Sequence, residues 1–331
     1  MTWLQFAATA LVIVFAGVRL ARYGDIIGEK SGLGRSWIGV VLLAATTSLP
    51  ELFTGFGATA LAALPDIAVG DVLGSCMFNL LILSLMDAVQ PEPISARAHQ
   101  GHALSIAFGL LLIGVAGLGL VAGHRLPVVG WIGLASPALM ALYFVAMRVI
   151  FTHERQRRRQ ETQEVAEQLA YDATTLRSAS LRYSAAALVV IAAALWLPRL
   201  GAELARQTGL GEAFVGSLLI AITTSLPEIV VSLAAVRIGA VDLGVANVLG
   251  SNLFNLLILG LDDVFYRQGP LMADAEPSHL VSILAVVMMN GLFLAGLTYR
   301  ALTKRFFVAW DTGAIAAVYT VAVMLSYWLS R

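Results

Sequence analysis

Two glutamates lie in the middle of long apolar stretches of this 331-residue chain. Glu51 lies within residues 37–63, and Glu228 lies within residues 211–236. An ionised carboxylate is costly in apolar surroundings, so a carboxylate in such a place is expected to have a function. Two carboxylates that meet would neutralise one divalent cation, and protons or monovalent cations would have to compensate them in its absence. The pair therefore predicts a site at which cations compete.

Hydroxyl residues precede each glutamate at helical spacing. Thr47 and Ser48 precede Glu51 by four and three residues. Thr224 and Ser225 precede the second glutamate in the same way. On a helix these spacings place the hydroxyls and the carboxylate on one side.

A proline directly precedes each glutamate, at Pro50 and Pro227. Proline lacks an N–H group and kinks or breaks a helix, so the carbonyls of Thr46 and Thr223 lose their usual partners. Such a break turns backbone oxygens toward an ion, and hard cations bind oxygen ligands. Both apolar stretches are therefore predicted to be broken helices.

A second set of polar side chains follows each glutamate. Ser75 and Asn79 are four residues apart, as are Ser251 and Asn255, so each pair shares one helix stripe. The pairs would add hydroxyl and amide oxygens to the site. Hydrogen bonding between helices is the alternative role for such residues, and their types alone leave both roles open.

One acidic residue, Asp71, precedes Ser75 by four residues on this stripe, where the other half has Asn247. Asp71 has two possible roles. It is either a cation ligand on the access path, which would make it an accessory site, or a solvated carboxylate near the start of a helix, where the helix dipole favours a negative charge. Asp262 and Asp263 fall near the end of a predicted span, and the sequence assigns them no special role.

The composition indicates a membrane protein. Apolar residues make up 59% of the chain and charged residues 13%, and the mean hydropathy is +0.82. These values are too apolar for a soluble protein of this length. The formal net charge is zero, which gives no reason to expect a nucleic-acid partner. Membrane lipid is the expected surroundings, and no signal indicates an oligomeric state.

A membrane-spanning helix needs about 20 apolar residues. By this measure the sequence predicts an all-α membrane protein with ten spans, of which the second and seventh are broken. The spans lie near residues 3–20, 37–63, 66–89, 101–123, 127–150, 182–199, 211–236, 242–265, 279–299 and 306–329.

The chain contains an internal repeat. AATTSLPE at 44–51 matches AITTSLPE at 221–228 in seven of eight positions, and GDVLGSCMFNLLIL from residue 70 matches ANVLGSNLFNLLIL from residue 246 in ten of fourteen. The sequence thus predicts a first five-helix repeat at 1–150, a linker at 151–180 and a second repeat at 181–331. An odd number of spans per repeat inverts the second one, which is a transporter architecture with sites at the repeat interface.

The basic residues predict the orientation in the plasma (inner) membrane. With the N-terminus outside, 16 of the 21 basic residues fall on the cytoplasmic side. The positive-inside rule therefore favours both termini outside and a cytoplasmic linker. The basic run at 155–159 also suits anionic lipid, although orientation alone explains it.

The motif TTSLPE, followed about 22 residues later by GS-x-x-x-N, occurs twice. This pattern resembles the alpha repeats of the calcium/cation antiporter superfamily, and of sodium/calcium exchangers in particular, with the motifs here at 44–83 and 221–259. The resemblance implies alternating access, with Na⁺ and Ca²⁺ sites around Glu51 and Glu228. Transported cations would be the substrates, and no cofactor is expected.

The resemblance also implies the ligands around the central glutamates. These are Thr47, Ser48, Thr224 and Ser225 through hydroxyl or carbonyl oxygens, Ala44 and Ala221 through carbonyl oxygens, and Ser75, Asn79, Ser251 and Asn255. Some relatives, including potassium-dependent ones, carry Asp where this chain has Asn255. A third central carboxylate is thus missing, which makes potassium transport less favoured.

Sodium-driven calcium exchange is the preferred hypothesis, because hydroxyl oxygens suit Na⁺, and exchange of H⁺ for Ca²⁺ or another divalent cation is the alternative. An enzyme is not expected, because no His, nucleophile or phosphate-binding Arg accompanies the glutamates within the spans. A passive channel is less favoured than alternating access because the repeats are broken and inverted. The five histidines lie in or near connections without metal-ligand spacing, and we expect them at the surface.

Overall fold

The computed structural model describes residues 1–30, 44–160, 175–300, 303–304 and 307–330, and most of these residues are helical. The long helices are α1 (Thr2–Lys30), α4 (Pro65–Ala88), α6 (His102–Ala122), α7 (Ala135–Gln160), α8 (Leu176–Thr208), α12 (Val241–Phe265), α14 (Leu280–Tyr299) and α15 (Trp310–Leu329).

Shorter elements connect the long helices. They are the α-helices α3 (Leu49–Phe56), α5 (Ile94–Arg97), α9 (Glu212–Val215), α10 (Ala221–Thr224), α11 (Leu226–Arg237) and α13 (Leu271–Asp274), the π-helices η1 (Gly57–Ala62) and η3 (Gly216–Ile220), the 3-10 turns η2 (Gly123–Arg125) and η4 (Pro277–His279), and the antiparallel strands β1 (Val128–Val129) and β2 (Ile132–Gly133).

Eight helices of the described residues are long and apolar enough to cross a membrane, and the bent pair 212–224 and 226–237 raises the number to nine. The chain is thus a multi-pass membrane protein. The predicted span near 37–63 lies partly outside the described residues, so the count of ten spans stays a prediction. The predicted span at 127–150 begins only at Ala135, because residues 128–133 form a hairpin whose turn contains Gly130 at a φ of 69°.

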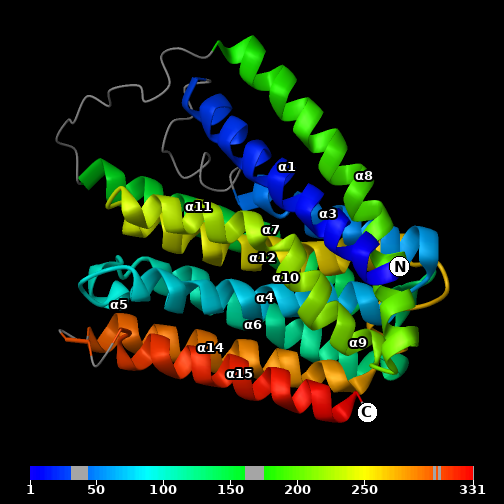
Figure 1. Cartoon of the computed structure of the whole chain (residues 1–331). Coiled ribbons are helices and arrows are strands. Elements are labelled where there is room, and N and C mark those ends of the chain that lie inside the picture. The colour runs from blue at the N-terminus through cyan, green and yellow to red at the C-terminus, as the bar shows by residue number, and fades with distance from the viewer. Residues whose placement is uncertain (31–43, 161–174, 301–302, 305–306, 331) are drawn as a thin grey trace.

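The helices form a layered bundle in which α4 and α12 occupy the centre and pack against each other. Most residues of these two helices are buried. The pair α1 and α8 covers one side, and the pair α14 and α15 covers the opposite side (Figure 1). Both chain ends lie at the same end of the bundle, whereas the side that faces the cytoplasm stays a prediction.

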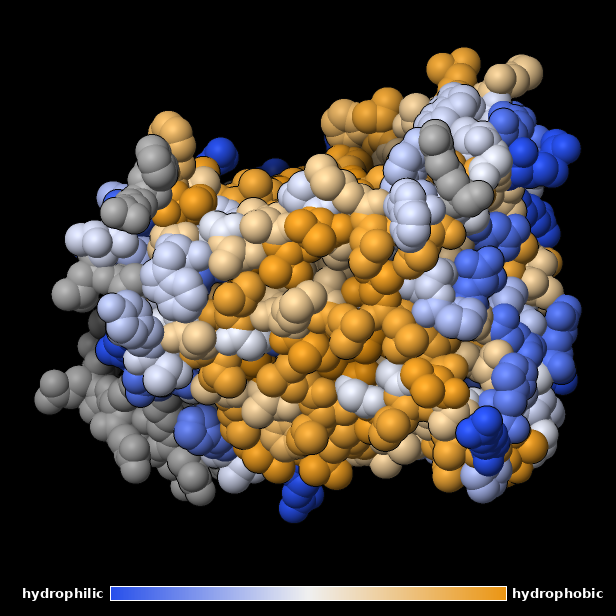
Figure 2. Space-filling model, turned by 90° about the horizontal axis from the view of Figure 1, so that it is seen from below, coloured by the Kyte–Doolittle hydropathy of each residue, from blue (hydrophilic) through white to orange (hydrophobic). Residues whose placement is uncertain are grey.

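The outer helices present apolar side chains outward. Leu284 and Met288 of α14 and Val321 and Met324 of α15 are each more than half exposed. Figure 2 views the side on which α14 and α15 lie and shows a broad hydrophobic band between more hydrophilic ends. Such a band matches the hydrocarbon layer of a membrane.

A buried aspartate fixes the C-terminal end of α4. One carboxylate oxygen of Asp87 accepts a hydrogen bond from the N–H of Ile94 at 2.8 Å. The other accepts from the N–H of Ala309 at 2.6 Å and from the hydroxyl of Thr312 at 2.7 Å. The carboxylate therefore ties α4 to the start of α15.

Asp263 fixes the end of α12 in the matching way. It accepts from the N–H of Leu271 at 2.6 Å, from the N–H of Gly133 at 2.9 Å and from the hydroxyl of Ser136 at 2.5 Å. These partners resemble those of Asp87, with one N–H shortly after the helix end and an N–H and a hydroxyl three residues apart, at 133 and 136 here and at 309 and 312 there. Asp263 thus has a structural role that the sequence did not indicate.

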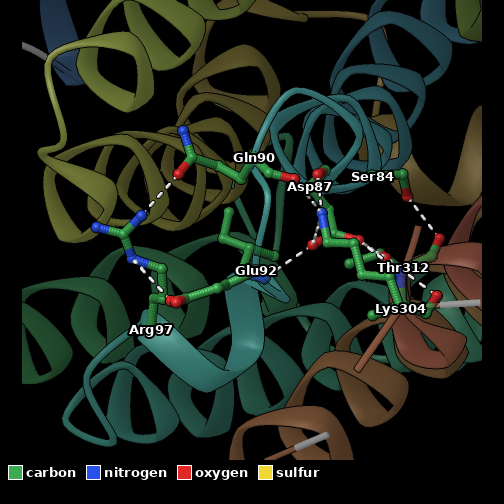
Figure 3. Close-up of polar contacts among 9 residues, drawn as sticks. Ser84, Asp87, Gln90, Glu92, Arg97, Lys304 and Thr312 are labelled. Atoms are coloured by element: carbon green, nitrogen blue, oxygen red, sulfur yellow. Dashed lines mark hydrogen bonds and ion pairs between the residues drawn. The ribbon is translucent and has the colours of Figure 1, made fainter. Parts of the chain in front are cut away.

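The two aspartate contacts differ in one cation. Lys304 lies 3.1 Å from a carboxylate oxygen of Asp87, and it donates to the carbonyls of Asp87 and Gln90 (Figure 3). Both side chains of this ion pair are nearly inaccessible, at 8% and 0% exposure. Lys304 precedes Thr312 by eight residues, and the residue at the same distance before Ser136 is Val128. Only the Asp87 end thus carries a lysine at this position.

One histidine differs from the sequence prediction. His279 is buried, and its Nε2 lies 3.1 Å from a carboxylate oxygen of Asp66. Asp66 also accepts from the N–H of Glu276. The expectation of a surface position is therefore wrong for His279, because the connection that carries it folds back against the start of α4.

We expect Asp87→Ala to destabilise the protein strongly. The substitution leaves the Lys304 ammonium and three hydrogen-bond donors without their carboxylate, and loss of one partner of a buried pair costs roughly 3–5 kcal/mol. Thermal unfolding of the purified protein in detergent measures the effect. Glu92→Gln is the control, because Glu92 pairs with Arg97 at 4.0 Å on the surface and such pairs contribute about 0–1 kcal/mol. Equal melting temperatures for the two variants would contradict the role of Asp87.

Candidate cation site

Each central glutamate follows a break in its helix. Ser48, with φ −87° and ψ 14°, separates the helical residues 44–47 from α3, and Ser225, with φ −88° and ψ 7°, separates α10 from α11. The two parts of the second stretch meet at 46°. Pro50 and Pro227 lie in the first turn after the break, where a missing N–H costs no helical hydrogen bond. The prolines thus start new helices and do not kink continuous ones.

The serines at the breaks reach across to the other half of the chain. Ser225 donates to Oε1 of Glu51 at 2.9 Å, and Ser48 donates to Oε1 of Glu228 at 3.1 Å. Helical spacing had grouped Ser48 with Glu51, but the break at Ser48 ends that spacing. Each half therefore supplies a hydroxyl to the carboxylate of the other half.

Longer contacts complete the two carboxylate environments. Ser75 lies 3.5 Å from Oε1 of Glu51, and Ser251 lies 3.4 Å from Oε1 of Glu228. The hydroxyl of Thr224 lies 3.4 Å from that of Ser75, and Thr47 lies 3.4 Å from Ser251. All of these side chains are buried. Hydrogen bonds of this length are weak, so little is lost when a cation draws the oxygens to itself.

The backbone oxygens of Ala44 and Ala221 adjoin the same hydroxyls. Thr47 donates to the carbonyl of Ala44 at 3.0 Å, and Thr224 donates to that of Ala221 at 3.2 Å. Each carbonyl also accepts the N–H of the serine at the break. These carbonyls are therefore close to the site and already hydrogen-bonded, and a ligand role would require one of these bonds to move.

The second oxygen of each glutamate has no hydrogen-bond partner. Glu51 and Glu228 are completely buried, and Oε2 of each is without a partner. A buried oxygen of this kind is costly unless a cation or proton compensates it. The described residues contain no group of three or more His, Cys, Asp or Glu side chains able to hold a metal ion. A cation here would thus be bound by two carboxylates with hydroxyl and amide oxygens.

The asparagines of the two halves are arranged differently. Asn79 donates to the side-chain oxygen of Asn252 at 3.1 Å, and Asn252 donates to the carbonyl of Cys76 at 3.2 Å. Both polar atoms of the Asn255 side chain are buried without a partner. Sequence reasoning missed Asn252. The available signal was that Cys76 and Asn252 occupy matching positions of the repeat and differ.

Asp71 belongs to the same buried cluster. Its side chain is inaccessible, one carboxylate oxygen accepts from the Thr224 hydroxyl at 3.0 Å, and the other has no partner. Its burial excludes the alternative of a solvated carboxylate. The structure thus joins the glutamates, the predicted serines and threonines, the two alanine carbonyls and Asp71 in one cluster of contacts, whereas the role of each one as a ligand stays a prediction.

A close helix approach holds this cluster together. A side chain at Gly74 of α4 would overlap the backbone of Ser217 in η3. The absence of a side chain at Gly74 lets α4 approach the broken stretch that carries Glu228.

The fold is similar to solved structures of membrane exchangers. The structure of the sodium-calcium exchanger NCX_Mj soaked with Na⁺ and Sr²⁺ superimposes with a TM-score of 0.63 at 22% identity, and covers 98% of this chain and 97% of that chain. The H⁺/Ca²⁺ exchanger CAX superimposes with a TM-score of 0.70 at 15% identity, and covers 99% of this chain and 86% of that chain. The chain therefore has the same fold as these exchangers.

Sequence comparison gives the family. The inner membrane protein YrbG of Escherichia coli (strain K12) is 32% identical over 253 residues, which are 76% of this chain and 76% of YrbG. The family profile described as sodium/calcium exchanger protein matches residues 1–152 and 182–328. The chain belongs to the sodium/calcium exchanger protein family.

We expect Ser48→Ala and Ser225→Ala to weaken Ca²⁺ binding to a similar extent. Each removes one hydroxyl from the glutamate of the other half, and a hydrogen bond to a charged group contributes about 1.5–3 kcal/mol, which corresponds to roughly tenfold or more in affinity. Calorimetric titration of the purified protein with Ca²⁺ measures the effect. Ser84→Ala is the control, because Ser84 bonds the carbonyl of Thr312 outside the site. A loss in only one of the two variants would contradict the equivalent roles of the serines.

Proposed function

We propose that the protein is a secondary active antiporter that exchanges Na⁺ for Ca²⁺ at a site built around Glu51 and Glu228. One observation carries the proposal. Each glutamate is buried with one oxygen bonded to a serine of the other half and the second oxygen without a partner. This arrangement provides two negative charges and several neutral oxygen ligands in a place from which water is excluded.

Competition for these charges would couple the two ions. One Ca²⁺ neutralises both carboxylates, and its departure leaves charges that Na⁺ must compensate. Exchange follows if the empty, charged site is too costly to change its access from one side to the other. The proposal includes ten spans in two inverted repeats, with the broken stretches around Ser48 and Ser225 at their interface near the midplane.

The oxygen ligands support Na⁺ as the coupled ion. The hydroxyls of Thr47, Ser48, Thr224 and Ser225 and the carbonyls beside them are neutral ligands of the kind that a hard monovalent cation binds. The amide Asn255 in place of a third carboxylate disfavours potassium. In the plasma (inner) membrane, both termini would lie outside and the linker at 151–180 would be cytoplasmic.

Proton coupling is the second candidate. The oxygens of Glu51 and Glu228 that lack a partner are equally suited to bind protons in the absence of Ca²⁺. The similarity of the fold to a structure named as an H⁺/Ca²⁺ exchanger is compatible with this alternative. The driving ion therefore has to be measured.

We expect Ca²⁺ uptake into proteoliposomes to follow an outward Na⁺ gradient and not an outward proton gradient. An uptake that responds only to the proton gradient would replace Na⁺ by H⁺ in the proposal.

Glu51→Gln and Glu228→Gln should each abolish uptake, because one carboxylate cannot neutralise Ca²⁺. Glu203→Gln is the matched control, because Glu203 pairs with Arg206 at 2.6 Å outside the site and should be dispensable. Full uptake activity in either the Glu51→Gln or the Glu228→Gln variant would contradict a site shared by the two carboxylates.

A further inference from the structure

A second buried aspartate lies one helical turn from Glu51. Asp262 of α12 is completely inaccessible, and neither of its carboxylate oxygens has a hydrogen-bond partner. The carboxylate lies directly against Gly55 of α3, where an added Cβ would be only 2.7 Å from Cγ of Asp262. Gly55 follows Glu51 by four residues, so Asp262 faces the same side of α3 as the central glutamate.

The corresponding place in the second half is neutral. There Asn247 of α12 donates to the hydroxyl of Ser232 in α11 at 3.1 Å. The repeat relates Asn247 to Asp71 and Ser232 to Gly55. Where the second half has an amide hydrogen-bonded to a hydroxyl, the first half has Asp71 and Gly55, which has no side chain to bond.

Asp262 occupies the side of α3 that the missing side chain at Gly55 leaves open. Asp71 reaches the same glutamate through hydroxyls, because it accepts from Thr224 at 3.0 Å, and Thr224 lies 3.4 Å from Ser75, which lies 3.5 Å from Glu51. One oxygen of Asp71, both oxygens of Asp262 and the hydroxyl of Thr54, the residue before Gly55, are buried without partners. Packing does not require these charges, because the matching positions of the repeat hold the neutral residues Asn247, for Asp71, and Met86, for Asp262. Two like charges buried together are costly unless a cation or proton compensates them.

We propose that Asp71, Asp262 and Thr54 form an accessory site for a hard cation beside Glu51, on one side of the central site only. The proposal rests on the proposed cation exchange, because the accessory site would serve ions on their way to the central pair. Asp71 lies in the first half of α4 and Asp262 near the end of α12, so both lie toward one membrane face. The predicted orientation makes this the outer face. A cation bound here would enter or leave through that face.

Calcium titration of the full chain in detergent, without Na⁺, tests the accessory site independently of transport. We expect two Ca²⁺ per chain for the wild type and one for Asp262→Asn, whose remaining site keeps its affinity. Glu228→Gln should lose the central site and retain the accessory one. Asp311→Asn is the matched control. Asp311 is also buried with both oxygens unpartnered and lies against Gly296, but between the outer helices α14 and α15. A single Ca²⁺ in the wild type, or an Asp262→Asn titration equal to that of the wild type, would overturn the proposal.

Vesicles of both orientations test the one-sidedness. In right-side-out and inverted membrane vesicles, Asp262→Asn should raise the half-saturating Ca²⁺ concentration by roughly tenfold or more on one side only, because a charged partner of the ion is lost. An equal rise on both sides would overturn the one-sided placement. If the wild type shows no exchange under any gradient, the proposed function fails, and the titration still decides whether the accessory site exists.

Discussion

Two carboxylates buried in the centre of an apolar bundle impose the main constraint on this structure. Glu51 and Glu228 need polar partners, but a regular helix in the membrane uses its own backbone groups internally. The breaks at Ser48 and Ser225 solve this problem, since each ends one helix and starts another in front of a carboxylate. The surrounding helices α4 and α12 are almost entirely buried because they must exclude lipid from these breaks.

Each half of the chain donates a serine hydroxyl to the glutamate of the other half, and this arrangement couples the two carboxylates to the relative position of the halves. The shorter serine hydrogen bond to each glutamate comes from the other half, because Ser225 bonds Glu51 and Ser48 bonds Glu228. Movement of one half against the other therefore changes the partners of both carboxylates together. In the proposed exchange, a bound cation that neutralises both carboxylates would lower the cost of this change, and occupancy of the site would then be linked to the relative position of the halves.

The sequence predicted the glutamates, their hydroxyl neighbours and most of the spans, because each feature is repeated or follows from apolar length. The sequence could not predict which glutamate Ser48 contacts. Helical spacing applies only within a continuous helix, and a proline locates a break only to within a few residues. The buried positions of Asp262, Asp263 and His279 were missed for a different reason. A charged or polar residue near the end of a span is expected in water, and only the packing of other segments over that end buries it.

Departures from the repeat locate the features that can distinguish the two membrane faces. The serine contacts of the two glutamates and the aspartate contacts at the ends of α4 and α12 occur twice, so these contacts do not distinguish one side from the other. Lys304 at Asp87 is found at one end, and the buried acids Asp71 and Asp262 lie toward the other. A symmetric site would bind an ion with equal affinity from both faces. The unmatched charges, together with the differing residues Cys76 and Asn252, are therefore the features that make the two sides of the site unequal.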